Sequence, residues 1–298
     1  MSDYEYLLYE PFDDGQIVRI LLNRPEARNA QNRAMLVELN DAFLRAEADD
    51  QVRVVILGGA GPMFTSGHDM GSKVAMEEIA NHPSWQENGA TRGGAERLML
   101  QEWHHFFENT RRWRNLRKIT IAQVHGPVYS AGLMLMWACD LIVAADDVVF
   151  ADVVGTRLGM CGVEYFAHPW EFGPRRAKEL LLTGDSLSVD EAHQMGMVSK
   201  VFPGDVLPER TLELARRIAQ TPTMAALLIK EAVNQSVDNM GFYNALNACF
   251  TLHELNHSHW AQQHDNRYPI AQEEDGVPNW KDAPPVVPAL KDQVRAEG

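Results

Sequence analysis

Cysteine is scarce in this chain, and its placement excludes a fold held together by disulfides. The 298 residues contain 3 cysteines, Cys139, Cys161 and Cys249. No two of them have CxxC spacing and their number is odd, so a disulfide framework is not expected. This cysteine usage fits a reducing compartment.

Long apolar runs are also missing. No uninterrupted run approaches the roughly 18 residues that a membrane-spanning helix needs. The first residues, Met1 to Glu5, lack the basic region followed by an apolar region that is typical of a secretory signal. We therefore expect a cytoplasmic protein that does not bind membranes.

Basic residues are also fewer than acidic ones. The chain has 27 lysines and arginines against 41 acidic residues, a formal net charge of −14. Proteins that bind nucleic acid usually present a basic face to the phosphate backbone, so no nucleic-acid partner is expected. The hydrophobic content of 45% is that of a folded protein with a large core.

The hydrophobic pattern predicts an α/β fold, because strand-like and helix-like segments alternate. Segments rich in Val and Ile predict strands over 16–22, 52–57, 119–124, 141–144 and 148–151. Apolar residues with helical spacing predict helices over 32–48, 103–116 and 133–139. The glycine-rich stretch 71–94 is expected to be a long loop with one short helix near 73–80.

The pattern changes after Pro203, where helices are predicted over 208–219 and 223–237. We expect a core over residues 1–203, a helical region over 204–268 and an irregular tail over 269–298. The tail combines several prolines with many charges, which favours a surface or disordered segment.

Two short turns point to a functional site. The first is Phe64 to Asp69, which follows the apolar run 54–57, and the second is Ser130 to Gly132, which follows the run 119–126. Small residues in both turns let the backbone approach a ligand closely. Two N–H groups from these distant segments would then point at one carbonyl oxygen, which is the arrangement of an oxyanion hole.

These turns belong to a set of motifs whose order and spacing resemble the crotonase (enoyl-CoA hydratase/isomerase) superfamily. The resemblance covers about residues 5–237. Besides the two turns, the motifs are Asn23 to Ala30, His125-Gly126, Ala138 to Leu141, Leu182 to Asp185 and Ala192 to Val198.

The resemblance implies a spiral of ββα units with C-terminal helices that assemble homotrimers or hexamers as dimers of trimers. It also implies an acyl-CoA thioester substrate, with coenzyme A as part of the substrate and no separate cofactor. The oxyanion-hole N–H groups fall on His68 and Ala131. His68 is expected to act through its backbone, with a catalytic imidazole as the alternative.

Coenzyme A contacts are implied for five positions around the first turn: Ala27, Arg28, Ala30, Ser66 and Asp69. Of these, Arg28 is suited to pair with a phosphate as a charged donor. A solvated loop charge is the other interpretation of Arg28.

The chain departs from the hydratase pattern at the paired glutamates that move protons across the double bond. Met134 stands at the first position, and Val154 or Gly155 stands at the second. Neither position can transfer a proton. The candidate acids nearby are Glu164, where some isomerase-like relatives place their carboxylate, and Asp152; a structural ion pair or cap is the alternative for both.

Two alternative functions remain. Residues His253 to His257 read HExxH, a pattern that on a helix places two imidazoles one turn apart to bind zinc for hydrolysis. The resemblance places this segment outside the acyl site, so no metal site is expected. The other alternative is a non-catalytic acyl-CoA-binding protein that kept the oxyanion hole and lost the acids.

Overall fold

Six strands form the main sheet of the protein, in the order β1-β2-β3-β4-β6-β9. The computed structural model describes residues 4–264, so the tail expected over 269–298 lies outside the described residues. The first pair of strands is antiparallel and the other pairs are parallel. The strands are β1 Leu7–Phe12, β2 Ile17–Leu22, β3 Val54–Gly59, β4 Ile119–Val124, β6 Leu141–Ala145 and β9 Lys200–Phe202.

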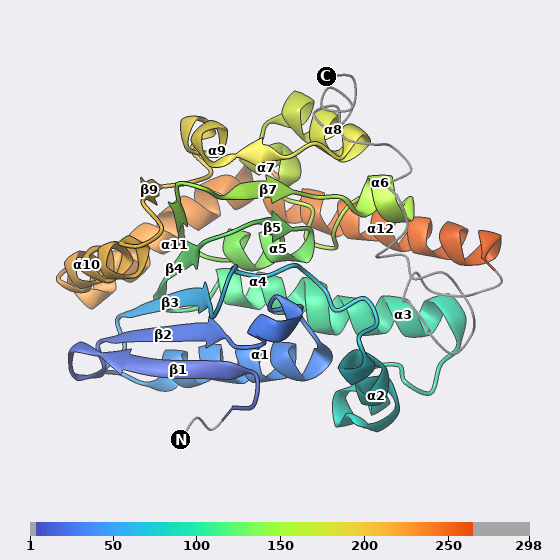
Figure 1. Ribbon diagram of the computed structural model, residues 1–298, viewed down its shortest axis with the longest axis horizontal. Coiled ribbons are helices and arrows are strands. Elements are labelled where there is room, and N and C mark those ends of the chain that lie inside the picture. The colour runs from blue at the N-terminus through green and yellow to red at the C-terminus, as the bar shows by residue number, and fades with distance from the viewer. Residues whose placement is uncertain (1–3, 265–298) are drawn as a thin grey trace.

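All six residues of β3 are buried, as expected for a central parallel strand rich in Val and Ile. Strand β1 was not predicted from the sequence because Pro11 interrupts its pattern. Its position explains how the proline is tolerated, since β1 lies at the edge of the sheet (Figure 1). A second, smaller sheet contains β5 Val128–Tyr129, β7 Val149–Ala151 and β8 Leu187–Ser188.

The helices confirm the alternating pattern. Helix α1, Arg33–Ala48, packs against β1 and β2 through an apolar face that includes Met35, Leu39 and Phe43. Helix α5, Ala131–Trp137, begins two residues earlier than predicted. The short helix expected in the long loop is α2, Lys73–Asn81.

The helix predicted over 103–116 is longer than expected. It begins as α3, Gly94–Glu102, continues as a π-helical segment, Trp103–Glu108, and ends as α4, Asn109–Arg114. The glycines near residue 90 predicted a loop, but Gly93 occupies the N-cap position of α3, where glycine is favoured. The remaining short helices are α6 Val154–Leu158, α7 His168–Glu171, α8 Pro174–Thr183 and α9 Val189–Met195.

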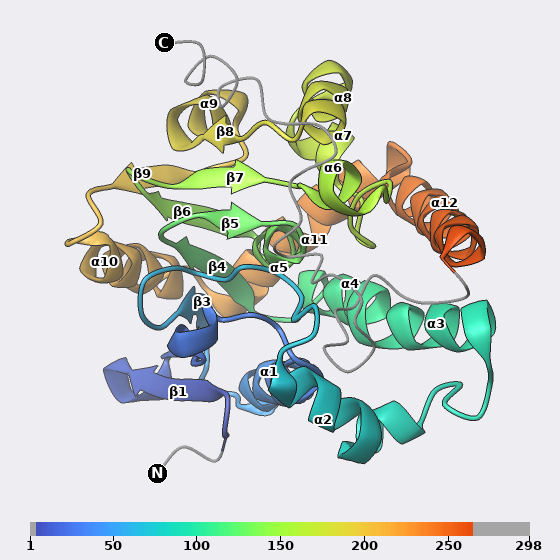
Figure 2. The ribbon, with the colours of Figure 1, turned by 45° about the vertical axis from the view of Figure 1, so that its right-hand side comes forward.

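Three C-terminal helices complete the fold: α10 Leu207–Ala219, α11 Thr223–Asn239 and α12 Phe242–Gln263. Helix α10 packs across β2, β3, β4 and β6, and α11 packs against β4. Helix α12 turns back along the molecule and lies beside α3 in both views (Figures 1 and 2). A segment near the end of the described chain therefore lies beside one from its first half.

Candidate active site

The two predicted turns are in direct contact. A Cβ atom added to Gly67, which has a φ of +91°, would lie 2.8 Å from the carbonyl oxygen of Tyr129 and 3.3 Å from the backbone nitrogen of Ala131. A Cβ atom on Gly132 would lie 2.9 Å from Cγ2 of Thr65. Only glycine allows the backbones to approach this closely.

The N–H groups of His68 and Ala131 are free to bind a ligand. In the first turn, the N–H of Gln31 donates to the Gly67 oxygen (2.8 Å) and the N–H of Asp69 donates to the Gln31 oxygen (3.1 Å). His68 lies between Gly67 and Asp69, and its own N–H takes part in neither bond. Within residues 4–264, neither His68 N nor Ala131 N donates a hydrogen bond. Both residues line one cavity of about 680 Å³, which is large enough for an acyl thioester.

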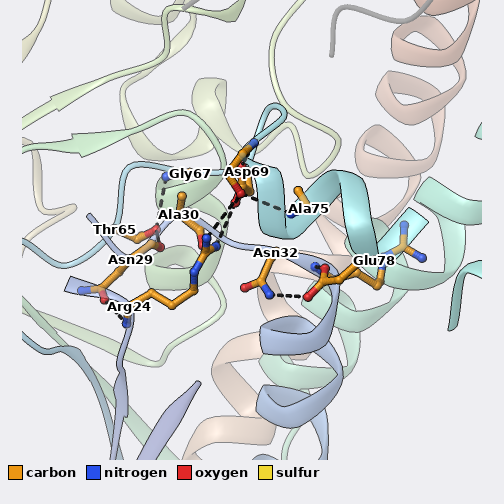
Figure 3. Close-up of polar contacts among 11 residues, drawn as sticks. Arg24, Asn29, Ala30, Asn32, Thr65, Gly67, Asp69, Ala75 and Glu78 are labelled. Atoms are coloured by element: carbon orange, nitrogen blue, oxygen red, sulfur yellow. Dashed lines mark hydrogen bonds and ion pairs between the residues drawn. The ribbon is translucent and has the colours of Figure 1, made fainter. Parts of the chain in front are cut away.

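A buried ion pair fixes the first turn (Figure 3). Arg24 Nη1 lies 2.8 Å from Asp69 Oδ2 and also donates to the Ala30 oxygen (2.8 Å). Asp69 accepts hydrogen bonds from the N–H and hydroxyl of Ser72. Burial raises the pKa of Asp69, but the Ser72 hydrogen bonds and Arg24 outweigh it and hold the pKa below its usual range. The Asp69 carboxylate is therefore ionised and anchors the loop.

The five positions implied for coenzyme A divide into two groups. Arg28, Ser66 and Asp69 line the cavity. Ala27 and Ala30 lie in the same turn as Arg28 but are not among the lining residues of the described chain. The Ser66 N–H donates to the Arg28 carbonyl oxygen (3.0 Å), which joins this turn to the first oxyanion turn.

Glu164 faces the His68 side of the cavity. Its Oε1 atom lies 3.6 Å from Nδ1 of His68, and its buried Oε2 atom has no hydrogen-bond partner within the described chain. The His68 ring stacks on Phe106 with centroids 4.0 Å apart. Burial lowers the pKa of His68, partly opposed by Glu164, so the imidazole is neutral at neutral pH. The structure thus brings His68, Ala131 and Glu164 to one cavity.

Three further residues line the cavity although the sequence did not lead us to expect them there: Glu102, His253 and His257. Glu102 Oε2 lies 3.3 Å from His253 Nε2 and 3.4 Å from His257 Nε2. His253 Nε2 is 3.9 Å from Glu164 Oε1. The expectation that the HExxH segment lies outside the acyl site is wrong, because α12 folds back along α3 and carries both histidines to the cavity.

Burial contributes to the pKa shift of every group in this cluster. Burial and the nearby Glu164 raise the pKa of Glu102 well above its usual range. Burial and the nearby Glu102 raise the pKa of Glu254 to about 9. Burial lowers the pKa of His257 to about 2, so this imidazole is neutral. Burial also lowers the pKa of His253, but its Cys161 hydrogen bond and Glu164 outweigh this and raise it to about 9.

Comparison with known proteins decides the family. The sequence model described as "Enoyl-CoA hydratase/isomerase" matches residues 13–283. The chain belongs to the enoyl-CoA hydratase/isomerase family. This confirms the family resemblance and the crotonase-like α/β fold predicted from the sequence, and with them an acyl-CoA enzyme of the hydratase or isomerase type.

Individual relatives agree with this membership. The chain is 63% identical over 293 residues to the Mycobacterium tuberculosis protein named "Putative enoyl-CoA hydratase EchA13", covering 97% of this chain and 92% of the relative. It is 30% identical to the Escherichia coli 1,2-epoxyphenylacetyl-CoA isomerase, covering 75% and 80%. The crystal structure of a probable enoyl-CoA hydratase from Mycobacterium smegmatis superposes with a TM-score of 0.78 at 40% identity, covering 90% and 100%.

The side chains at the positions expected for the paired hydratase glutamates carry no carboxylate. Met134 is buried inside α5, and Val154 lines the cavity with an apolar side chain. A Cβ atom on Gly155 would meet the carbonyl oxygens of Leu181 and Met160 at 3.0 and 3.2 Å. Two of the carboxylates that line the cavity, Glu164 and Glu102, lie beside the histidines instead.

Asp152, the second acid singled out from the sequence, does not line the cavity. Its carboxylate pairs with His168 Nε2 at 2.9 Å and accepts the N–H groups of Val154 (3.1 Å) and Val163 (3.2 Å). Both side chains of the pair are buried. Burial raises the pKa of Asp152, but these hydrogen bonds and the charge of His168 outweigh it and lower the pKa. The geometry favours the structural alternative for Asp152.

Asp152→Ala is therefore expected to destabilise the fold by about 3 kcal/mol, because it leaves His168 buried without its partner. Since the folded pKa of Asp152 lies below its unfolded value, the contribution is present above about pH 4 and is lost as the pH falls through the folded pKa. Urea unfolding of both proteins at several pH values measures the difference. A stable variant with abolished turnover would instead make Asp152 a catalytic residue.

Among residues 4–264, no helix is both long enough and apolar enough to cross a membrane.

Proposed function

We propose that this protein catalyses the reversible hydration of a 2-enoyl-CoA thioester. The observation that carries the proposal is the position of Glu164, which faces the cavity beside the oxyanion-hole residue His68. The names of the M. tuberculosis and M. smegmatis relatives support hydration. We also place the protein in the cytoplasm, in acyl-CoA metabolism such as that of fatty acids.

The chemistry follows from where charge develops. When oxygen adds to C3 of the enoyl group, the electron pair of the double bond moves onto the thioester oxygen. The N–H groups of His68 and Ala131 would stabilise this enolate, and such a donor typically contributes about 3 kcal/mol. Glu164 takes a proton from the attacking water and returns it to C2.

The substrate's coenzyme A portion would enter past the turn that contains Arg28 and Ser66. Arg28 lines the cavity next to the first oxyanion turn, where a guanidinium can pair with a phosphate. The oxyanion hole then receives the thioester at the opposite end of the pantetheine arm. Coenzyme A enters as part of the substrate and leaves as part of the product, because hydration leaves the thioester bond intact.

Assays with 2-butenoyl-CoA and longer 2-enoyl-CoA esters test this function. Hydration removes the enoyl absorbance and yields a product heavier by one water. Conversion of a 3-enoyl-CoA to its 2-enoyl isomer without water uptake, in the absence of hydration, would identify an isomerase instead. Tight binding of these thioesters without turnover of any class would identify a non-catalytic acyl-CoA-binding protein.

The C-terminal helices support assembly into a homotrimer or a hexamer. Helix α11 exposes a series of apolar side chains: Met224, Leu228, Ile229 and Val233. Leu228, Ile229 and Val233 are each more than half exposed in the single chain, at 56%, 61% and 58%. Contiguous apolar surface of this kind marks protein–protein contacts.

Leu228→Asp is expected to shift the assembly to monomers, because a carboxylate would be buried in the apolar contact. Light scattering after size-exclusion chromatography measures the mass. Leu182→Asp is the matched control, since Leu182 is 71% exposed on α8 and outside this surface. An unchanged mass for Leu228→Asp would remove α11 from the interface.

A further inference from the structure

Two histidines and one carboxylate converge at the end of the acyl cavity. His253 and His257 occupy positions i and i+4 of α12, so both imidazoles project from one face of the helix. Their Nε2 atoms lie 2.8 Å apart. Glu102, at the end of α3, contributes an oxygen at 3.3 and 3.4 Å from these two nitrogens.

We propose that Glu102, His253 and His257 bind a divalent metal ion, preferentially zinc, at a site that opens into the acyl cavity. Two imidazoles and one carboxylate form a donor set that catalytic zinc uses, with the fourth position left to water. All three residues line the cavity, so water and the substrate reach the remaining coordination position.

The spacing of the three ligand atoms fits a small metal ion. In a tetrahedral site with bonds of about 2.0–2.1 Å, neighbouring ligand atoms lie about 3.3 Å apart. The two oxygen–nitrogen distances of 3.3 and 3.4 Å already match this value. The two nitrogens lie 2.8 Å apart, so they need to separate by about half an ångström when a metal binds between them.

The surroundings of His253 orient it as a metal ligand. Its Nδ1 atom lies 2.8 Å from the carbonyl oxygen of Gly162, which can only accept a hydrogen bond. Nδ1 therefore carries a hydrogen, which leaves Nε2 as the ring nitrogen that can bind a metal ion beside His257 and Glu102. A backbone carbonyl that fixes the second ring nitrogen is typical of histidines that bind metals.

Glu102 provides a second observation that favours a metal ion at this place. Its side chain is 7% exposed, and its Oε2 atom has no hydrogen-bond partner within the described chain. Within residues 4–264, its ion-pair partners are the two imidazoles and no lysine or arginine. A divalent ion would give this oxygen a bonded partner, which the imidazoles reach only at 3.3 and 3.4 Å.

The site differs from the usual HExxH arrangement in the residue that serves as base. Glu254, the acid within the motif, is buried and is not among the cavity-lining residues within 4–264. Glu164 takes its place, with Oε1 at 3.9 Å from Nε2 of His253. A carboxylate from a different segment thus faces the expected metal-bound water.

A role in hydration follows, and it rests on the proposed function. The metal holds the water and lowers its pKa toward neutrality. Glu164 accepts one proton, the hydroxide oxygen bonds to C3, and the electron pair of the C2=C3 bond moves to the thioester oxygen at the oxyanion hole. Glu164 then returns the proton to C2. In this way the metal replaces the second glutamate that other hydratases use to hold the water.

Zinc binding by the untagged full-length protein tests the site without reference to activity. Elemental analysis and titration against a chromophoric zinc chelator are expected to show one tightly bound zinc per chain. His257→Ala and Glu102→Gln should each weaken zinc binding by at least about 100-fold, because each removes a ligand. His259→Ala is the matched control, since His259 is exposed on the same helix. Circular dichroism confirms that each variant is folded.

The outcomes separate the metal site from the proposed function. Zinc binding that is equally weak in the wild type and in His257→Ala would overturn the site, whatever the assays show. Full hydration by the metal-free enzyme would overturn the metal's role and leave the hydratase intact. Tight zinc binding without hydration would support the site and count against the hydratase. Glu164→Gln should retain zinc and lose hydration.

Discussion

Glu164→Gln is expected to reduce kcat for enoyl-CoA hydration by about 10²–10⁴-fold, the usual range for loss of a general acid–base group. The amide has nearly the shape of the carboxylate but cannot accept and return a proton. KM should change little, because Arg28, Ser66 and the oxyanion hole are unaltered. Steady-state kinetics with a 2-enoyl-CoA, together with calorimetric binding of a saturated acyl-CoA, distinguish the two effects.

Glu171→Gln is the matched control for this experiment. Glu171 belongs to α7, a few residues beyond Glu164, and is not among the lining residues of the described chain. Burial raises its pKa to about 7, so replacement by an amide changes little near neutral pH. Turnover of Glu164→Gln at the rate of Glu171→Gln would exclude Glu164 as the proton carrier and make Glu102, the acid beside His253, the next candidate.

The backbone part of the site was predictable from the sequence because it depends on local chemistry. Gly67 and Gly132 are small residues in the turns that follow two predicted strands, and neighbouring parallel strands end at one edge of a sheet. The structure brings these turns into contact as expected. The predicted helix over 32–48 and the strand over 119–124 were also correct, because their apolar spacing is regular.

The acids of the site were not equally predictable. Glu164 and Asp152 are both acids near the expected position, and the sequence does not show which one faces the cavity. The structure shows that the ion pair with His168 holds the Asp152 carboxylate away from the cavity. The sequence did not mark Glu102 as a site residue, because the helix was predicted to begin at residue 103 and Glu102 fell outside it.

The HExxH segment shows why spacing alone does not locate a site. The interval between His253 and His257 correctly predicted two imidazoles on one helix face. Their distance from the oxyanion turns depends on the path of α12 along α3, which no local pattern in the sequence specifies. The third proposed ligand, Glu102, lies 151 positions before His253 in the sequence.

Gly67→Ala is expected to impair both stability and turnover. The added methyl would lie 2.8 Å from the Tyr129 oxygen and 3.3 Å from the Ala131 nitrogen, so the two turns must separate. Overpacking of about 1–3 kcal/mol adds to about 1–2 kcal/mol for alanine at positive φ. Displacing one oxyanion donor should lower kcat by about 10²–10³-fold in the fraction that folds. Urea unfolding and kinetics on the folded protein measure the two losses.

Gly196→Ala separates the conformational cost from the close contact. Gly196 ends α9 with a φ of +88°, close to the +91° of Gly67, and an added Cβ would meet nothing within 4 Å. This control should lose only the conformational part of the stability and retain full kcat. If Gly67→Ala matched it in both measurements, the two turns would tolerate a methyl group between them, and the oxyanion hole would not depend on their close approach. A selective loss of kcat in Gly67→Ala would instead show that the hole requires that contact.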